Sequence, residues 1–224
     1  MLSRTNIDPN KRLTALIIPF YNELKRFDFE ALIELSINSQ EFLDIYLVDD
    51  GSEDGLPELI QEMILELKFP NVFLLSAENN LGKANAIRFG FKGIPNLLST
   101  YNFIGFTDAD FSSPPSEILR LANFKNENDY EFVFGTRIST KENLIRTTKF
   151  RFIQGKMFTI LVSFILGGKF LDSQCGLKYI RLSEATVKMF QEEFLNDWLI
   201  DLEMLCRIQK LKKVELIYAL QTTQ

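Results

Sequence analysis

Two aspartates stand one residue apart where an apolar run of the sequence ends. Asp108 and Asp110 follow Phe103 to Thr107, a run typical of a buried strand. Side chains at i and i+2 of an extended chain project to the same side, so one Mg²⁺ or Mn²⁺ can bridge both carboxylates to a diphosphate. Aspartate is also common at strand ends and helix caps, and the pair alone fits that structural role equally well.

A second acidic strand end precedes the first in the chain. The apolar run from Phe42 to Val48 is followed by Asp49, Asp50 and Gly51. A carboxylate at the carboxyl end of a parallel strand can accept hydrogen bonds from a base or a ribose, although Asp-Gly is also an ordinary turn signal. Two acidic strand ends in one sheet favour a shared ligand site.

A Gly-Lys pair opens a predicted helix between these two acidic ends. Gly82 and Lys83 precede an amphipathic stretch, where backbone N–H groups and a cation are suited to phosphate. The pair lacks the upstream glycine and the following Ser or Thr of a P-loop, which disfavours ATP hydrolysis of that kind. A plain helix start with an exposed lysine is the alternative interpretation.

A local cationic stretch stands out in an acidic protein. Residues 137–156 hold six cations and one anion, and the apolar run from Met157 to Leu166 follows at once. This order indicates a peripheral amphipathic element that contacts phosphate or anionic lipid. A solvated loop that leads into a core helix fits the same residues.

Composition excludes several classes of chemistry. The chain has no histidine, which excludes His-based triads and His-ligated zinc, so Asp and Glu must carry any acid–base work. A net charge of −5 argues against general nucleic-acid binding. The two cysteines, Cys175 and Cys206, form no CxxC pair and are expected to be buried thiols. No run reaches the roughly 18 to 20 apolar residues that cross a bilayer.

Strand and helix patterns alternate over the first 135 residues. Apolar runs predict strands at residues 13–18, 42–48, 72–75, 103–107 and 132–135, with helices at 56–67 and 82–91, a further helix after Pro114, and room for one between the first two strands. Parallel neighbours need crossover connections, so this alternation predicts an α/β fold with a mostly parallel sheet and helices on both faces.

The second half of the chain has a different pattern. We expect a helix near residues 150–166, a short strand at 176–180, and helices near 183–190 and 201–210. We expect one domain at residues 12–224, with a nucleotide-binding half at 12–112 and an acceptor half at 113–224. Residues 1–11 are expected to form an N-terminal arm.

Taken in order, the motifs resemble glycosyltransferase family 2, and within it the dolichyl- and polyprenyl-phosphate glucosyltransferases and mannosyltransferases. The resemblance spans nearly the whole chain. It rests on an ordered series of segments: Ile18-Pro19-Phe20-Tyr21-Asn22-Glu23, Val48-Asp49-Asp50-Gly51-Ser52, Asn80-Leu81-Gly82-Lys83, Asp108-Ala109-Asp110, Gly135-Thr136-Arg137, Asp172-Ser173-Gln174-Cys175-Gly176-Leu177-Lys178 and Asp201-Leu202-Glu203. It implies a single-domain GT-A fold, which is Rossmann-like.

The resemblance also implies roles for single residues. In the nucleotide pocket it places Pro19, Tyr21, Glu23, Asp50, Lys83 and Arg88. It makes Asp110 the main metal ligand, with Asp108 at the ribose or at the metal-bound diphosphate. Arg137 would face phosphates or the acceptor, Gln174 the donor sugar, and Asp201 would be the catalytic base or would position the acceptor. One departure is Ala84, where relatives have a second glycine.

The resemblance therefore predicts an inverting, metal-dependent hexosyltransferase that uses Mg²⁺ or Mn²⁺. Its donor would be a nucleotide sugar such as UDP-glucose or GDP-mannose, and its acceptor a polyprenyl or dolichyl phosphate. We expect a cytoplasmic protein that contacts the membrane face peripherally and binds no nucleic acid. Access to lipid would come from that contact, from a partner, or from a segment beyond these residues.

Other functions stay open at this point. The acceptor can be a sugar hydroxyl in a surface polysaccharide or glycan, in which case a positioned carboxylate must take its proton. The chain can also be a non-catalytic nucleotide-sugar-binding module. A nucleotidyltransferase uses similar acidic strand ends with metal and releases pyrophosphate in place of a nucleoside diphosphate.

Overall fold

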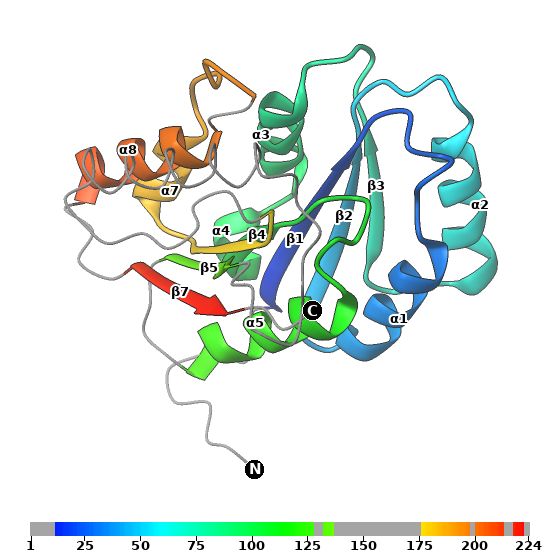
Figure 1. Ribbon diagram of the computed structural model, residues 1–224, viewed down its shortest axis with the longest axis horizontal. Coiled ribbons are helices and arrows are strands. Elements are labelled where there is room, and N and C mark those ends of the chain that lie inside the picture. Colours follow the sequence, from blue (N-terminus) through cyan, green and yellow to red (C-terminus); the bar gives the residue numbers. More distant parts are fainter. Residues whose placement is uncertain (1–11, 128–131, 137–175, 198–199, 213–216, 222–224) are drawn as a thin grey trace, which may run out of the picture.

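The computed structural model describes residues 12–127, 132–136, 176–197, 200–212 and 217–221 (Figure 1). Its strands are β1 (Arg12–Phe20), β2 (Leu43–Asp49), β3 (Val72–Ser76), β4 (Tyr101–Phe106), β5 (Phe132–Thr136), β6 (Lys178–Arg181) and β7 (Ile217–Gln221). They form one seven-stranded sheet in the order β3-β2-β1-β4-β6-β5-β7. The predicted α/β architecture with a mostly parallel sheet is confirmed.

The helices of the described chain fall between these strands. They are α1 (Phe29–Ser39), α2 (Leu56–Leu67), α3 (Lys83–Gly93), the short α4 (Leu97–Thr100), α5 (Pro115–Glu127), α7 (Glu184–Met189) and α8 (Ile200–Lys212). Helix α1 occupies the room left between the first two strands, and Asp28 caps it by accepting from the N–H of Ala31 at 2.9 Å.

The alternation of side chains along β1 explains why helices cover both faces of the sheet. Ala15 and Ile17 belong to one core, together with apolar residues of α3, α7 and α8. Leu16 and Ile18 belong to the other core, with residues of α1, α2 and α5. Successive side chains of a strand point to opposite faces, so a central strand that is apolar throughout needs cover on both sides. Figure 1 shows α1, α2 and α5 apart from α3, α7 and α8.

Strand β6 runs against its neighbours. It pairs antiparallel with β4 and with β5, and Lys178 lies opposite Phe106. The start of β6 therefore lies beside the end of β4, which brings the residues around Gly176 to the edge where Asp108 follows β4. The sequence analysis predicted a strand at 176–180 without its direction, and it did not predict β7, which pairs parallel with β5.

Some expectations fall outside the described residues or are left as predictions. The N-terminal arm, the cationic stretch at 137–156, the apolar run at 157–166 and Cys175 all lie outside them. The division into halves at residue 112 stays a prediction. Among the helices that the structure describes, none is both long and apolar enough to cross a bilayer.

Candidate active site

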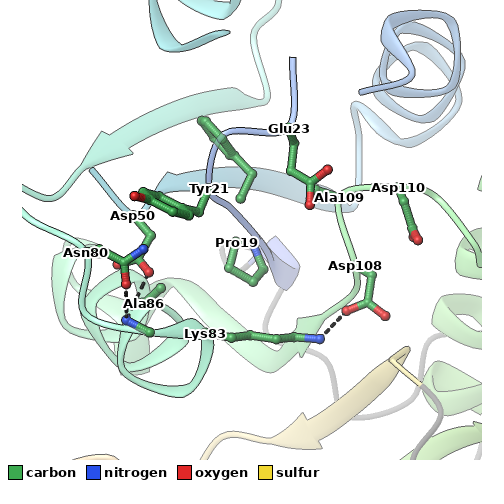
Figure 2. Close-up of a pocket in the computed structure, with 12 residues that line it drawn as sticks. Pro19, Tyr21, Glu23, Asp50, Asn80, Lys83, Ala86, Asp108, Ala109 and Asp110 are labelled. Atoms are coloured by element: carbon green, nitrogen blue, oxygen red, sulfur yellow. Dashed lines mark hydrogen bonds and ion pairs between the residues drawn. The ribbon is translucent and has the colours of Figure 1, made fainter. Parts of the chain in front are cut away.

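The carboxyl ends of β1, β2 and β4 meet around one open cavity of about 370 Å³. Ligands of parallel α/β sheets bind at this edge because the loops that follow the strands converge there. The lining comes from four separate parts of the chain (Figure 2): Pro19, Phe20, Tyr21, Glu23, Asp50, Asn80, Gly82, Lys83, Ala86, Asp108, Ala109 and Asp110. The two acidic strand ends of the sequence therefore share one site.

The loop after β1 is fastened to the loop after β2. The N–H of Asn22 donates to Ser52 Oγ at 3.0 Å, and Asn22 Oδ1 accepts from the N–H of Glu53 at 2.8 Å. These bonds hold Asn22 in the left-handed region, at a φ of 52°, which Asn tolerates better than most residues. Tyr21 and Glu23, on either side of Asn22 in this loop, both line the cavity.

Glu23 keeps one carboxylate oxygen free for a ligand. Its Oε1 accepts from Arg26 Nη2 at 2.6 Å, whereas Oε2 is buried and has no hydrogen-bond partner within the described part of the chain. A buried acceptor without a partner is costly, so a donor from a ligand in the cavity would stabilise it. Base N–H groups and ribose hydroxyls are such donors.

Asp50 holds the loop before α3 in place at one side of the cavity. The residue is 3% exposed, and its two oxygens accept from the N–H groups of Leu81 and Gly82 at 2.7 and 3.0 Å. Burial raises the pKa of the Asp50 carboxyl above its ordinary value, against the effect of these two hydrogen bonds. Asp50 thus fixes the Gly-Lys loop, and its contact with a base or ribose stays a prediction.

Lys83 and Asp108 form an ion pair across the cavity, drawn as a dashed line in Figure 2. Asp108 is also approached by the chain before β6, since a Cβ added at Gly176 would lie 2.3 Å from Asp108 Oδ2. Only a residue without a side chain fits there. Lys83 stands at the first position of α3, so its ammonium group adds positive charge at the helix N-terminus that lines the cavity.

Asp108 and Asp110 suit a hard divalent cation. Both carboxylates line the cavity, and Asp110 Oδ1 also accepts from the N–H of Ser112 at 2.9 Å. No cluster of three or more acidic, Cys or His side chains occurs in the described ranges. Mg²⁺ commonly takes only one or two protein carboxylates and completes its shell with phosphate oxygens and water. The residues present fit that arrangement with a bound diphosphate.

Arg88 does not lie where the sequence analysis expected it. It is absent from the cavity lining, and its Nη2 donates to the carbonyl of Gln191 at 2.9 Å. Five residues along a helix turn a side chain by about 140° relative to the start, so Lys83 and Arg88 face different directions. Arg137 and Gln174, the two other predicted ligands of phosphate and sugar, lie outside the described residues.

Asp201 lies in the first turn of α8 and is held by a buried lysine. Lys178 Nζ contacts Asp201 Oδ1 at 2.9 Å, and the lysine side chain is only 2% exposed. Asp201 does not line the cavity, but Lys178 lies opposite Phe106, two residues before Asp108. The pair is therefore anchored beside the carboxyl end of β4. The catalytic or positioning role of Asp201 stays a prediction.

Sequence reasoning missed several residues of this region. Asn80 lines the cavity and accepts from the N–H of Gly82 at 3.0 Å, and its place in the Asn-Leu-Gly-Lys motif was the available signal. Asp197 accepts from the N–H of Ala84 at 2.9 Å. Lys178 ends the segment that begins at Asp172, and that segment was the available signal for it. Asp197 follows Ala84 by more than a hundred residues, and no local pattern marks it.

Comparisons with known proteins agree with this geometry. The model of Glycosyl transferase family 2 matches residues 15–184. A dolichyl-phosphate beta-glucosyltransferase of Trichomonas vaginalis is 30% identical over 218 residues, which are 92% of this chain and 64% of that protein. An undecaprenyl-phosphate 4-deoxy-4-formamido-L-arabinose transferase of Yersinia pestis is 29% identical over 178 residues, 78% of this chain and 50% of that protein. The chain thus spans only part of both relatives.

A solved structure shows the same fold. Glucosyl-3-phosphoglycerate synthase from Mycobacterium tuberculosis, in complex with Mn²⁺, uridine diphosphate and glucosyl-3-phosphoglycerate, has a TM-score of 0.68 at 14% identity. The match covers 94% of this chain and 70% of that one. It confirms the expected GT-A architecture. On the family match, the ordered motifs and this fold, the chain belongs to glycosyltransferase family 2.

Proposed function

We propose that this protein transfers a hexose, with inversion, from a nucleotide sugar to a polyprenyl phosphate, and that it requires Mg²⁺ or Mn²⁺. The observation that carries the proposal is the convergence of Glu23, Asp50, Lys83, Asp108 and Asp110 on one cavity at the carboxyl edge of the sheet. The cavity combines acceptors for a nucleoside, a cation for phosphate and two carboxylates for a metal.

The donor is held by groups that stand at fixed places around the cavity. The unpartnered oxygen of Glu23 accepts from the nucleoside, and the first turn of α3 with Lys83 faces the diphosphate. Asp108 and Asp110 would hold a divalent cation, which would supply positive charge to the departing nucleoside diphosphate. When the donor binds, Lys83 leaves its ion pair with Asp108 and pairs with a diphosphate oxygen.

The relatives and the ion pair of Asp201 support the proposed acceptor class. The Trichomonas vaginalis and Yersinia pestis proteins are named as transferases that act on dolichyl phosphate and undecaprenyl phosphate. A phosphate monoester has a second pKa of about 6, so it is largely dianionic at neutral pH and attacks without a strong base. Asp201 Oδ1 is already engaged by Lys178, which suits a carboxylate that orients an acceptor better than one that takes a proton.

The test is a transfer assay on purified protein with radiolabelled UDP-glucose and GDP-mannose, dolichyl phosphate in detergent, and Mn²⁺ or Mg²⁺. We expect label in the organic extract with one of the two donors, and no label there when a chelator is present. Folded protein that binds the donor yet labels no polyprenyl phosphate would refute the acceptor. Label transferred to a glycan instead would favour the sugar hydroxyl, and release of free sugar without any acceptor product would leave only donor hydrolysis.

Replacing Asp201 by Asn separates the two acceptor classes. A phosphate acceptor predicts a modest loss of kcat, within about tenfold, because the nucleophile is already anionic. A hydroxyl acceptor predicts a loss of about 100-fold or more, because deprotonation must accompany attack.

A further inference from the structure

The segment at residues 189–197 connects α7 to α8 and packs along α3. The N–H of Phe194 donates to Asn85 Oδ1 at 3.2 Å, and Arg88 Nη2 donates to the carbonyl of Gln191 at 2.9 Å. Phe190, at the end of α7, stacks on Phe91 of α3 with ring centroids 4.2 Å apart. The connecting segment therefore lies directly against the helix whose first turn lines the cavity.

Asp197 caps α3 from a distant part of the chain. The residue at the N-cap of α3 is Gly82, which has no side chain to accept from the first N–H groups of the helix. Asp197 Oδ1 accepts from the N–H of Ala84 at 2.9 Å in its place. A Cβ added at Gly82 would lie 2.3 Å from Asp197 Oδ2, so the glycine is what lets this carboxylate approach. The cap adjoins Lys83, a lining residue of the cavity.

Arg207 of α8 holds the other side of the connecting segment. Its guanidinium donates to the carbonyls of Met189 at 2.7 Å and Glu193 at 2.6 Å, and it lies over the ring of Phe194, 4.5 Å from the centroid. Glu203 of α8 accepts from the N–H of Leu195 at 3.0 Å and pairs with Arg207. An arginine that is bonded to backbone carbonyls in this way fixes the path of the chain.

The connecting segment thus joins the helix of the donor cavity to the helix that carries Asp201. We propose that Asp197 and Arg207 are positioning residues, which clamp residues 189–197 between α3 and α8 and so set the place of Asp201 relative to the bound donor. The inference rests on the proposed function for the role of Asp201. Neither residue touches a reacting atom, and their effect is transmitted through the chain that they hold.

The experiment compares variants that break the clamp with variants that keep it. Asp197→Ala removes the acceptor for Ala84, whereas Asp197→Asn keeps an oxygen that can accept from it. Arg207→Met keeps an apolar stem over Phe194 and loses the donors. Glu193→Gln is the matched control: the Glu193 side chain is 79% exposed, so its 3.8 Å ion pair with Arg88 contributes little, and the carbonyl that accepts from Arg207 is kept.

For Asp197→Ala and Arg207→Met we expect kcat to fall by about tenfold, with the donor KM within about threefold of wild type. Asp197→Asn and Glu193→Gln keep kcat within about threefold. In an Asp201→Asn background, Asp197→Ala lowers kcat no further, because the group that it positions is already disabled. The inference would be overturned if the losses in kcat from Asp197→Ala and Asp201→Asn were additive, or if Asp201→Asn alone caused no loss. It would also be overturned if Asp197→Ala and Asp197→Asn lowered kcat equally, or if only the donor KM changed.

Hydrogen exchange tests whether the clamp couples α3 to α8, and it does not depend on measuring enzyme activity. Within the described residues Arg207 makes no hydrogen bond to α3, yet Arg207→Met should speed exchange at the amide of Ala84, since the clamp that holds Asp197 is loosened. Faster exchange confined to α8 would show that the segment does not couple the two helices. If the wild-type protein transferred no sugar, the proposed function would be refuted. The exchange experiment would still test whether the clamp exists, because it does not require transfer.

Discussion

The acidic residues around the cavity differ in the partners that the fold gives them. Both oxygens of Asp50 accept from backbone N–H groups, Asp108 is paired with Lys83, and Glu23 keeps a buried oxygen without a partner in the described chain. In the proposed function, the same side-chain chemistry therefore serves a loop, a phosphate or metal site, and a nucleoside site. This division gives each residue its own test.

Replacing Asp110 by Asn removes a charged metal ligand and leaves the hydrogen bond to Ser112 possible. We expect kcat/KM to fall by about 100-fold or more, and binding of Mn²⁺ in the presence of a nucleoside diphosphate to weaken in parallel. Steady-state kinetics and calorimetry measure the two effects. Glu62→Gln, at an exposed position of α2, is the control and should change neither. Full activity of Asp110→Asn at limiting metal would contradict the metal site.

Replacing Glu23 by Gln tests the nucleoside site. The neutral amide loses the charged acceptor whose Oε2 is buried at the cavity, so we expect the nucleoside diphosphate to bind about tenfold more weakly. Arg26→Met removes the partner of the other Glu23 oxygen. Because the Arg26 side chain is exposed, this substitution should change the affinity for the nucleoside diphosphate by no more than about threefold. Larger weakening from Arg26→Met than from Glu23→Gln would show that the ion pair, and not the free oxygen, matters.

Asp50 predicts a pH dependence of stability with a definite sign. Burial raises the pKa of its carboxyl above the ordinary 3.8, so ionisation costs free energy in the folded state only. The contribution of Asp50 to stability is full below 3.8 and declines as the pH rises through the raised value. Unfolding in urea at about pH 4 and pH 7 should show a larger advantage over Asp50→Asn at the lower pH. A larger advantage at pH 7 would mean that the two hydrogen bonds outweigh burial.

At the scale of elements, the sheet edge and the start of α3 decide where these residues meet. Gly82 and Gly55 both precede helices and have nearly equal φ values of 83° and 84°. A Cβ at Gly55 would meet nothing within 4 Å, whereas one at Gly82 would collide with Asp197. Their ψ values differ, however: Gly55 lies in the left-handed helical region at 2°, whereas Gly82 lies at 152°, in a region essentially limited to glycine. Gly82 therefore has two requirements for glycine, its backbone conformation and the close approach of the Asp197 carboxylate.

Gly82→Ala, made in the wild-type chain and in an Asp197→Ala background, separates these two effects. An alanine at the φ and ψ of Gly82 costs about 1–3 kcal/mol in either background. In the wild-type chain the substitution should cost a further 1 kcal/mol or so, on the order of a lost helix cap, because Asp197 must move away from Ala84. Urea unfolding of the variants measures the difference. Equal losses in the two backgrounds would show that Asp197 yields at no cost and that its cap contributes nothing.

The elements that the sequence predicted well are those with local patterns. The apolar runs of β1 and β2 and the helical spacing of α2 depend on neighbours in sequence, and the structure confirms all three elements. The direction of β6 and the presence of β7 depend on pairing with strands far away in the chain. The four residues from Ile217 to Leu220 are apolar, which was a usable signal for β7, but so short a run does not by itself distinguish strand from helix.

For the site, the motif order predicted which strand ends would meet, because parallel strands end at one edge. Its role for Arg88 stays a prediction: Arg88 is not among the lining residues and donates to Gln191, because five residues along a helix turn a side chain away from the residue that opens it. The pairing of Lys178 with Asp201 and the capping of α3 by Asp197 join residues that no spacing rule connects. Such contacts follow from the tertiary arrangement alone.

At the scale of the whole molecule, one sheet carries both the donor cavity and the strand that anchors Asp201. Strands β1, β2 and β4 end at the cavity, and the antiparallel β6 starts beside it with Lys178. Helix α3 lines the cavity with Lys83 and Ala86, and the connecting segment packs against α3. The arrangement allows a nucleotide sugar to reach the end of β4 with Asp201 held nearby.

The most direct measurement is a crystal structure of the protein grown with Mn²⁺ and a nucleoside diphosphate, with anomalous data collected at the manganese edge. Our account predicts one strong anomalous peak within coordination distance of Asp108 or Asp110, diphosphate oxygens bound to the same ion, and Lys83 moved from Asp108 onto the phosphates. A manganese peak away from both aspartates, or a nucleotide bound outside the cavity of Glu23 and Asp50, would contradict it.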